Sequence, residues 1–357
     1  LPELTAALAH GAAAVLQAPP GAGKSTVVPL ALQAESWARG RRILMLEPRR
    51  IAARAVARRM AQTLGEAAGE TIGYRTRFDT RVGPRTRIEV VTEGILTRML
   101  QSDPGLEGVA AILFDEFHER SLQADLGLAL VLDARSTLGL DLRIVAMSAT
   151  LDGAAVAALL ADATGTPAPI VTSMGRSFPV TTQYLGRGMP LLPGPESPER
   201  AVVQAVRRAL GEAPGDLLVF LPGAGEIRRV ASMLEEGGGP APGVRVLPLY
   251  GELDPAAQDA ALEPDRHGGR RIVLATNIAE TSLTIPGIRI VIDSGLVRRS
   301  VFDPATGMSR LETQRISRAS ADQRQGRAGR VEAGVCYRLW SEGSHRSLAA
   351  ATPPEIV

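Results

Sequence analysis

The sequence predicts an α/β protein of two tandem domains, each a mostly parallel sheet covered by helices. Short apolar runs alternate with amphipathic segments from residue 12 onward, and the alternation breaks at residues 163–179 before a second such series begins. Apolar strands that alternate with helices are typical of a parallel sheet with both faces covered. The chain has 357 residues, which is enough for two domains that each bury a core.

Each series supplies five predicted strands. In the first series they are residues 13–18, 42–48, 87–92, 111–116 and 143–150. In the second series they are residues 216–223, 244–251, 270–277, 288–295 and 333–340. Residues 50–64 predict a helix, because an apolar residue recurs there at every fourth position. We interpret residues 163–179 as a linker, and residues 186–200 and 235–243 as surface loops.

The composition is that of a soluble globular protein, with 45% hydrophobic and 22% charged residues. No apolar run reaches about 18 residues, so we expect no membrane span. The first 20 residues lack a basic leader followed by an apolar core, and we expect no signal peptide. The single cysteine, Cys336, excludes an internal disulfide and indicates a cytoplasmic protein. The net charge of +2 permits a nucleic-acid partner without requiring one.

Residues 17–28, QAPPGAGKSTVV, contain Lys24, the only lysine among the 40 basic residues of the chain. The segment lies between a predicted strand and a predicted helix, as a phosphate-binding loop does. Lysine suits such a loop because its ammonium is a compact charge on a flexible stem, whereas the guanidinium of arginine is a broad planar fork. We therefore predict that Lys24 binds the β- and γ-phosphates of a nucleotide and acts in its hydrolysis. The other predicted nucleotide-binding residues of this loop are Gly21, Ala22, Gly23, Ser25 and Thr26, and Ala18 stands where the loop pattern begins with glycine.

A metal ligand and a water activator are predicted from AILFDEFHER, residues 111–120. Here a buried strand ends in two adjacent carboxylates, and the carboxyl ends of parallel strands are where such sheets bind ligands. We predict that Asp115, with the hydroxyl of Ser25, holds Mg²⁺. We predict that Glu116 polarises the attacking water.

Seven segments then occur in an order that resembles the motif series of superfamily-two helicases, and specifically of the DEAH-box group. They are GAGKST 21–26, EPRRIAAR 47–54, TEGIL 92–96, DEFHER 115–120, SAT 148–150, ATNIAETSLTIPGI 275–288 and QRQGRAGR 323–330. Phe117 and residues 302–330 are similar to the bacterial HrpB-type branch of that group. The resemblance covers nearly the whole chain.

The resemblance implies two RecA-like P-loop NTPase domains, residues 1–172 for nucleotide binding and residues 173–342 as the helicase C-terminal domain. Residues 343–357 would then begin a winged-helix domain, because TPPEI resembles the entry to one. On this interpretation the chain is a motor core from a longer protein. We expect it to hydrolyse NTP but to unwind duplexes poorly.

The resemblance also assigns catalytic and coupling residues. Gln323, Arg327 and Arg330 would face the γ-phosphate from the second domain, so that hydrolysis depends on domain closure. We expect the two arginines, three residues apart, to lie on one helical face. The resemblance further implies that three residues couple the nucleotide state to domain closure. These are His118, Ser148 and Thr150.

Nucleic-acid binding is implied at positions that hold the sugar–phosphate backbone in the family. They are Arg49, Arg50, Thr92, Thr276 and Asn277. Such contacts do not identify bases, so we expect sequence-independent, salt-sensitive binding. Aromatic residues make up only 3% of the chain, which argues against a stacking platform along a groove. Residues 297–317 predict a β-hairpin around DPATG, where the family carries a hairpin that guides or splits strands.

The family implies that Arg59 stacks on the nucleobase, whereas its usual aromatic partner in the second domain corresponds to Leu296 here. We therefore expect weak base selectivity, with ATP, GTP and other NTPs all hydrolysed with Mg²⁺. The expected activity is a helicase or translocase that moves along single-stranded RNA, with 3′-to-5′ polarity implied by the family. Two alternatives stay open. One is a DNA translocase with the same motor, and the other is a P-loop NTPase that acts as a switch. We expect a monomer with no membrane partner.

Overall fold

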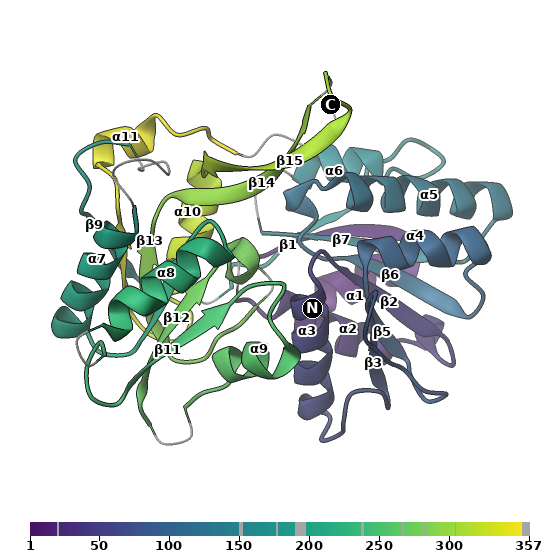
Figure 1. Cartoon of the computed structure of the whole chain (residues 1–357). Helices are drawn as coiled ribbons and strands as arrows, with labels where there is room; N and C mark the ends of the chain where they lie inside the picture. Colours follow the sequence, from purple (N-terminus) through teal and green to yellow (C-terminus); the bar gives the residue numbers. More distant parts are fainter. Residues whose placement is uncertain are drawn as a thin grey trace. The chain divides into compact units, whose positions relative to one another are not determined.

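The computed structural model divides the chain into two compact units, the first of which ends at Gly175 (Figure 1). It describes residues 1–19, 21–149, 153–175, 178–189, 198–236, 239–265, 268–281, 283–303 and 305–351. Thr150 and the segment TPPEI lie outside the described residues. Both units are α/β, which confirms the predicted fold class.

The first unit contains an eight-stranded sheet in the order β4-β3-β5-β2-β6-β7-β1-β8. The strands are β1 (Ala13–Gln17), β2 (Arg42–Glu47), β3 (Ile72–Arg75), β4 (Thr80–Arg81), β5 (Ile88–Thr92), β6 (Val109–Phe114), β7 (Arg143–Ser148) and β8 (Ile170–Thr172). All neighbouring strands are parallel except β3 and β4. The helices are α1 (Pro2–His10), α2 (Lys24–Gln33), α3 (Arg50–Thr63), α4 (Glu93–Ser102), α5 (Leu122–Leu138) and α6 (Gly153–Leu159).

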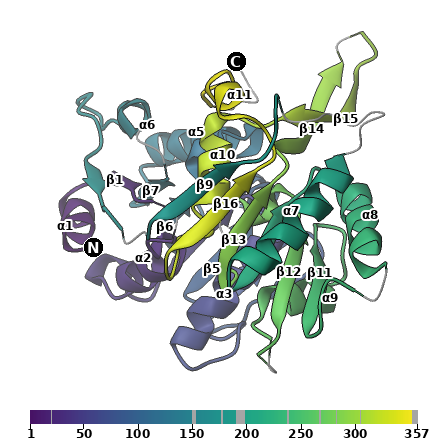
Figure 2. The same ribbon diagram turned by 90° about the vertical axis from the view of Figure 1, so that its left-hand side faces the viewer.

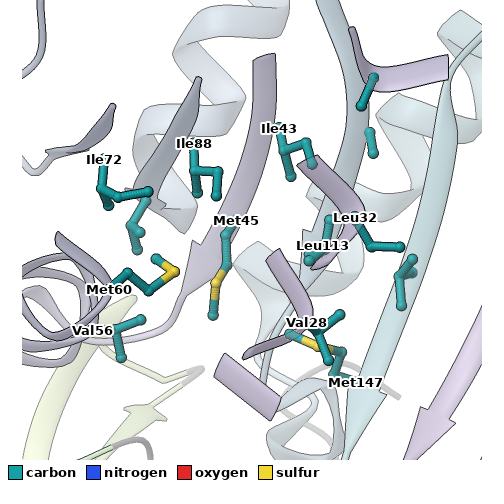
Figure 3. Packing of buried hydrophobic residues seen from close by; sticks show 14 of the residues in the cluster. Val28, Leu32, Ile43, Met45, Val56, Met60, Ile72, Ile88, Leu113 and Met147 are labelled. Atoms are coloured by element: carbon teal, nitrogen blue, oxygen red, sulfur yellow. The ribbon is translucent and has the colours of Figure 1, made fainter. Parts of the chain in front are cut away.

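Side chains alternate along the central strands and fill a core on each face of this sheet. Ile43 and Met45 of β2 join one cluster with α2 and α3, in which Val28 and Met60 pack against the strands (Figure 3). Leu44, between them in β2, joins a second cluster with residues of α4 and α5. A parallel sheet covered on both faces follows from this alternation, as the near-continuous apolar strands predict.

The second unit contains a parallel six-stranded sheet in the order β11-β12-β10-β13-β16-β9, whose last three strands lie side by side in Figure 2. The strands are β9 (Val180–Tyr184), β10 (Asp216–Phe220), β11 (Val244–Leu249), β12 (Arg270–Ala275), β13 (Ile288–Asp293) and β16 (Gly334–Arg338). The helices are α7 (Pro198–Glu212), α8 (Ala224–Glu235), α9 (Pro255–Leu262), α10 (Arg318–Gln325) and α11 (Glu342–Arg346). The predicted hairpin is confirmed as β14 (Leu296–Asp303) paired antiparallel with β15 (Met308–Arg315).

Two of the expected irregular segments contain regular structure. The predicted linker, residues 163–179, includes β8, which pairs with β1 and so extends the first sheet by one strand. The predicted loop 186–200 includes the start of α7 at Pro198. Neither element has a clear pattern in the sequence. The strand β8 has only three residues, and the proline that begins α7 is also a common loop residue. No helix within the described ranges is long and apolar enough to cross a membrane.

Cys336 lies in the middle of β16, between β13 and β9, and is fully buried. Burial raises the pKa of its thiol to about 12, so at pH 8 only roughly one thiol in ten thousand is the reactive thiolate. We expect no reaction with a disulfide reagent such as DTNB in the native protein, and stoichiometric reaction after denaturation in guanidinium chloride. Rapid labelling of the native protein would contradict the position of this side chain.

Candidate functional site

The segment after β1 has the backbone of a phosphate-binding loop. Gly21 and Gly23 have φ angles of 86° and 82°, and Gly23 is the residue that caps the start of α2. A Cβ at Gly23 would lie 3.1 Å from Cγ2 of Val27 in addition to the strained φ, so glycine is required at this turn. The N-terminus of α2 thereby follows the loop directly, which places backbone N–H groups and the positive end of the helix dipole at the same point.

Lys24 is the first residue of α2, and its side chain is folded back over the loop. Its Nζ donates a hydrogen bond of 2.7 Å to the carbonyl oxygen of Ala18, and the residue is only 6% exposed. An alanine is tolerated at position 18 because its backbone is not left-handed. Among the described residues, the non-glycine residues with positive φ are Leu106, Glu116 and Arg120. The ammonium thus lies inside the loop, where phosphate oxygens would replace the carbonyl as its acceptors.

Two oxygen ligands suited to Mg²⁺ converge beside this loop. The hydroxyl of Ser25 donates to Oδ2 of Asp115, which follows β6 directly, and Asp115 is buried. Burial raises the pKa of Asp115, and the neighbouring charge of Glu116 raises it further, whereas Lys24 lowers it. The described residues contain no group of three or more His, Cys, Asp or Glu side chains that could hold a metal. With Ser25 and Asp115 as two ligands, Mg²⁺ bound here would take further ligands from phosphate and water, as it commonly does.

Glu47, at the end of β2, belongs to this site although its sequence position gave no indication of a role. It is fully buried, and its side chain lowers the pKa of the Asp115 carboxyl. The strand order explains the contact, because β2 and β6 are neighbours and the N–H of Asp115 bonds to the carbonyl of Leu46 at 3.1 Å. The register between strands, which brings these carboxylates together, is not evident from spacing along the chain.

Glu116 lies in the left-handed region, with φ of 50° and ψ of 33°, immediately before a 3₁₀ turn at Phe117–Glu119. A non-glycine residue with positive φ is uncommon and is frequent at functional sites. Its Oε2 lies 3.5 Å from Nδ1 of His118. The same Nδ1 accepts a hydrogen bond of 3.3 Å from the backbone N–H of Ala149. His118 therefore joins the DEFHER segment to the SAT segment within the first unit.

Arg49 and Arg50, after β2, have different surroundings. Arg49 forms a bidentate ion pair with Glu119, with N–O distances of 2.8 and 3.0 Å, whereas Arg50 is exposed at the start of α3. Thr92 caps the start of α4, and Arg59 is exposed on α3. The ion pair ties EPRR to DEFHER, a role that neither segment indicated in the sequence.

The three predicted catalytic residues of the second unit follow or occupy α10. Gln323 lies on the helix, but α10 ends at Gln325, so Arg327 and Arg330 lie beyond it in turns. The expectation of one helical face is therefore wrong. Close packing explains the turns, since a Cβ at Gly329 would lie 2.5 Å from the carbonyl oxygen of Phe178.

Both arginines bond to residues 280–284, which follow β12. Arg327 is 4% exposed and donates to the carbonyl oxygens of Glu280, at 2.8 Å from Nε, and Leu283, at 2.6 Å from Nη1. Arg330 donates to the hydroxyl of Thr284 at 2.5 Å and remains partly exposed. Arg327 thus has a structural role in this arrangement, and Arg330 is the more accessible guanidinium.

Arg324, one position after Gln323, is fully buried and anchors the same region. It forms ion pairs of 2.8 Å with Glu280 and 2.9 Å with Asp293, and its guanidinium lies 4.8 Å from the ring centroid of Phe220. A buried arginine of this kind needs such partners, because an unpaired buried charge is very costly. It connects α10, the segment after β12 and the end of β13.

The remaining predicted positions of the second unit lie at the carboxyl end of β12 and the start of β14. Thr276 and Asn277 begin a 3₁₀ turn, and both are partly exposed. Leu296 is fully buried, so its side chain offers no surface to a nucleobase in this arrangement of the unit.

The comparisons with known proteins agree with these motifs. Residues 3–159 match the family described as DEAD/DEAH box helicase, and residues 201–332 match the helicase conserved C-terminal domain. The chain is 50% identical to the ATP-dependent RNA helicase HrpB of Escherichia coli. The alignment covers the whole chain and 42% of that protein. It is 38% identical to the pre-mRNA-splicing factor ATP-dependent RNA helicase prp22 of Schizosaccharomyces pombe. That alignment covers 96% of the chain and 29% of prp22.

Two solved structures are similar over the whole chain. A crystal structure of the E. coli DEAH/RHA helicase HrpB gives a TM-score of 0.89 at 49% identity, with 44% of that chain covered. A structure of the E. coli DExH-box NTPase HrpB gives 0.81 at 49% identity, with 42% covered. The chain therefore spans less than half the length of these relatives. It belongs to the DEAH-box helicase family and carries that family's two RecA-like domains.

Proposed function

We propose that the chain is an NTP-driven motor that hydrolyses Mg²⁺–NTP with residues of both units and moves along single-stranded RNA. The supporting observation is that two incomplete sets of catalytic groups occur in separate units. Lys24, Ser25, Asp115 and Glu116 lie in the first unit, and the accessible guanidinium of Arg330 lies in the second. The first set supplies the phosphate-binding loop and one cation, Lys24, and the second set supplies a further cation to oppose charge that develops on the γ-phosphoryl group.

The proposed chemistry follows from these residues. The backbone of residues 21–26 and the ammonium of Lys24 bind the β- and γ-phosphates. Ser25 and Asp115 would hold Mg²⁺, which neutralises charge on those phosphates when it is bound. Glu116 and Gln323 orient the attacking water, and Glu116 accepts its proton as the bond to the γ-phosphorus forms and the bond to the leaving oxygen breaks. Arg327 and Arg330 stabilise the transferring group once the units come together.

Coupling and domain limits are part of the same proposal. His118 and Ser148, with Thr150, report the state of the nucleotide to the second unit. His118 supports this role because it contacts both Glu116 and the backbone at Ala149. We assign residues 1–172 to the nucleotide-binding domain, 173–342 to the C-terminal domain, and 343–357 to the start of a winged helix.

The proposed nucleic-acid contacts are the exposed Arg50, its neighbour Arg49, and the helix- and turn-starting residues Thr92, Thr276 and Asn277. Guanidinium, hydroxyl and amide groups bind phosphate and sugar without distinguishing bases, so affinity should fall steeply with salt. RNA is favoured as the substrate because the matched relatives are named RNA helicases. We place the protein in the cytoplasm, which agrees with its single, buried cysteine. We also propose that it is a monomer and that it moves in the 3′-to-5′ direction, which the family implies.

The proposal includes weak base selectivity. Arg59 is exposed on α3 and available to stack on a base, whereas Leu296, at the position of the family's aromatic partner, is buried. A base held from one side only is poorly distinguished from another base, so ATP, GTP, CTP and UTP should be hydrolysed with similar kcat/KM. A strong preference for ATP would contradict this part of the proposal.

Steady-state NTP hydrolysis with and without polynucleotides tests the proposal. We expect stimulation by poly(U), and a loss of about 100-fold or more in kcat/KM for Lys24→Ala, because the variant loses charge stabilisation at the phosphates. Matched RNA and DNA strands separate an RNA motor from a DNA translocase. Hydrolysis that no strand stimulates would instead support an NTPase switch, and a fully active Lys24→Ala would remove the proposed site.

A further inference from the structure

The side chain of Phe78 is held out in solvent by a fixed turn between β3 and β4. It is 75% exposed. The N–H and the hydroxyl of Thr76 both donate to the carbonyl oxygen of Asp79, at 2.9 and 3.0 Å. The carboxylate of Asp79 accepts a hydrogen bond of 2.8 Å from the buried Tyr74. The turn is therefore anchored to the core at its base, and its tip presents the phenyl ring.

Two guanidinium groups lie against this ring. The Cζ atom of Arg77 is 5.1 Å from the ring centroid, and that of Arg50 is 5.6 Å away. Arg77 belongs to the same turn, whereas Arg50 comes from the start of α3, so the group is formed by the fold and not by the local sequence. A ring that is largely exposed and has two guanidinium groups over it matches a ligand that carries both an aromatic ring and negative charge. A nucleotide within a strand has both.

The sheet places this ring in line with the proposed backbone contacts of the first unit. β3, β5 and β2 are adjacent and parallel, with Arg75 opposite Val91 and Thr92 opposite Glu47. Their carboxyl ends therefore lie at one edge of the sheet, in consecutive order. That edge carries Phe78 after β3, Thr92 at the end of β5, and Arg50 after β2.

We propose that Phe78 stacks on a base of a single nucleic-acid strand whose sugar–phosphate backbone is held at Arg50 and Thr92. This inference rests on the proposed nucleic-acid binding and adds to it a base contact that the low aromatic content argued against. One ring on a rigid turn suffices for such a contact. Because every base has a π-face, the contact strengthens binding without conferring sequence specificity.

Fluorescence anisotropy with a labelled short oligouridylate, and with an abasic strand of the same phosphate number, tests the inference. We expect Phe78→Ala to weaken binding of the oligouridylate about 5- to 100-fold, the effect of losing one stacked base. Phe78→Trp should bind as tightly as the wild type, and Phe78→Leu should be as weak as the alanine variant. The slope of log Kd against log salt should not change, because no phosphate contact is lost.

The abasic strand should bind equally to the wild type and to Phe78→Ala. Leu138→Ala is the matched control, because it removes another exposed apolar side chain, 53% exposed at the end of α5, and should leave affinity unchanged. Two results would overturn the stacking role of Phe78 but not the proposed function. One is that Phe78→Ala binds the oligouridylate as tightly as the wild type, and the other is that it loses the same affinity for the oligouridylate and for the abasic strand. Failure of the wild type to bind either strand would instead overturn the proposed function as well.

Discussion

Arg330→Ala is expected to lower kcat for NTP hydrolysis by about 10³- to 10⁵-fold, the range seen when an arginine that stabilises phosphoryl transfer is removed. Its guanidinium is partly exposed and donates to the hydroxyl of Thr284, so we expect its loss to cost the fold less than the loss of the buried Arg327. Single-turnover hydrolysis at saturating nucleotide measures the effect on chemistry directly. The midpoint of thermal unfolding should stay close to that of the wild type.

Arg327→Ala provides the contrast. It removes the donor to the partly buried carbonyl oxygen of Glu280 and to the buried carbonyl oxygen of Leu283, and a buried group left unsatisfied costs about 1–3 kcal/mol. We therefore expect this variant to lose thermal stability as well as activity. Arg330→Lys keeps the charge without the planar fork and should recover only part of the rate. Full activity of Arg330→Ala in a folded protein would show that the second unit supplies no cation at this position.

Glu116→Gln is expected to lower kcat by about 10²- to 10⁴-fold while nucleotide still binds. Glutamine preserves the shape of the side chain but cannot accept the proton of the attacking water. The substitution leaves unchanged Lys24, which we propose binds the phosphates, and Ser25 and Asp115, which we propose hold the metal, so the Kd for a fluorescent nucleotide should stay within a few-fold of the wild-type value. The pair of measurements separates chemistry from binding.

Glu107→Gln is the matched control for this substitution. Glu107 is exposed just before β6, whereas Glu116 follows the same strand, so an identical change is made at the opposite end. We expect Glu107→Gln to hydrolyse NTP at the wild-type rate. A comparable loss in both variants would point to a general effect of removing a carboxylate, and weaker nucleotide binding by Glu116→Gln would contradict its assignment to water activation.

The fold and the phosphate loop could be predicted because their signals are local. Apolar runs mark the strands, and the glycines and the single lysine before α2 mark a loop whose geometry depends on a few neighbouring residues. The hairpin at residues 297–317 was likewise predictable from two extended runs around a turn sequence. The sheets, the turn at Gly23 that starts α2 and the hairpin are confirmed by the elements observed, whereas phosphate binding by the loop stays a prediction.

The parts that could not be predicted depend on contacts between distant segments. Glu47 meets Asp115 through the register of β2 against β6, and Glu119 meets Arg49 across 70 residues of chain. The end of α10 before Arg327 follows from packing of Gly329 against Phe178, which the spacing of two arginines cannot indicate. The contact between Phe78 and Arg50 could not be predicted either, because Arg50 begins a helix that follows β2, whereas Phe78 follows β3.

The buried ion pairs of Arg324 have a mechanical consequence. One cation is fastened to the segment that carries Thr276 and Asn277, through Glu280, and to the floor of the sheet, through Asp293. It also lies in the same short stretch of chain as Arg327 and Arg330. If that segment binds a nucleic-acid strand, as we propose, a force on the strand would move Arg327 and Arg330 together with the segment, because the buried ion pairs connect them rigidly.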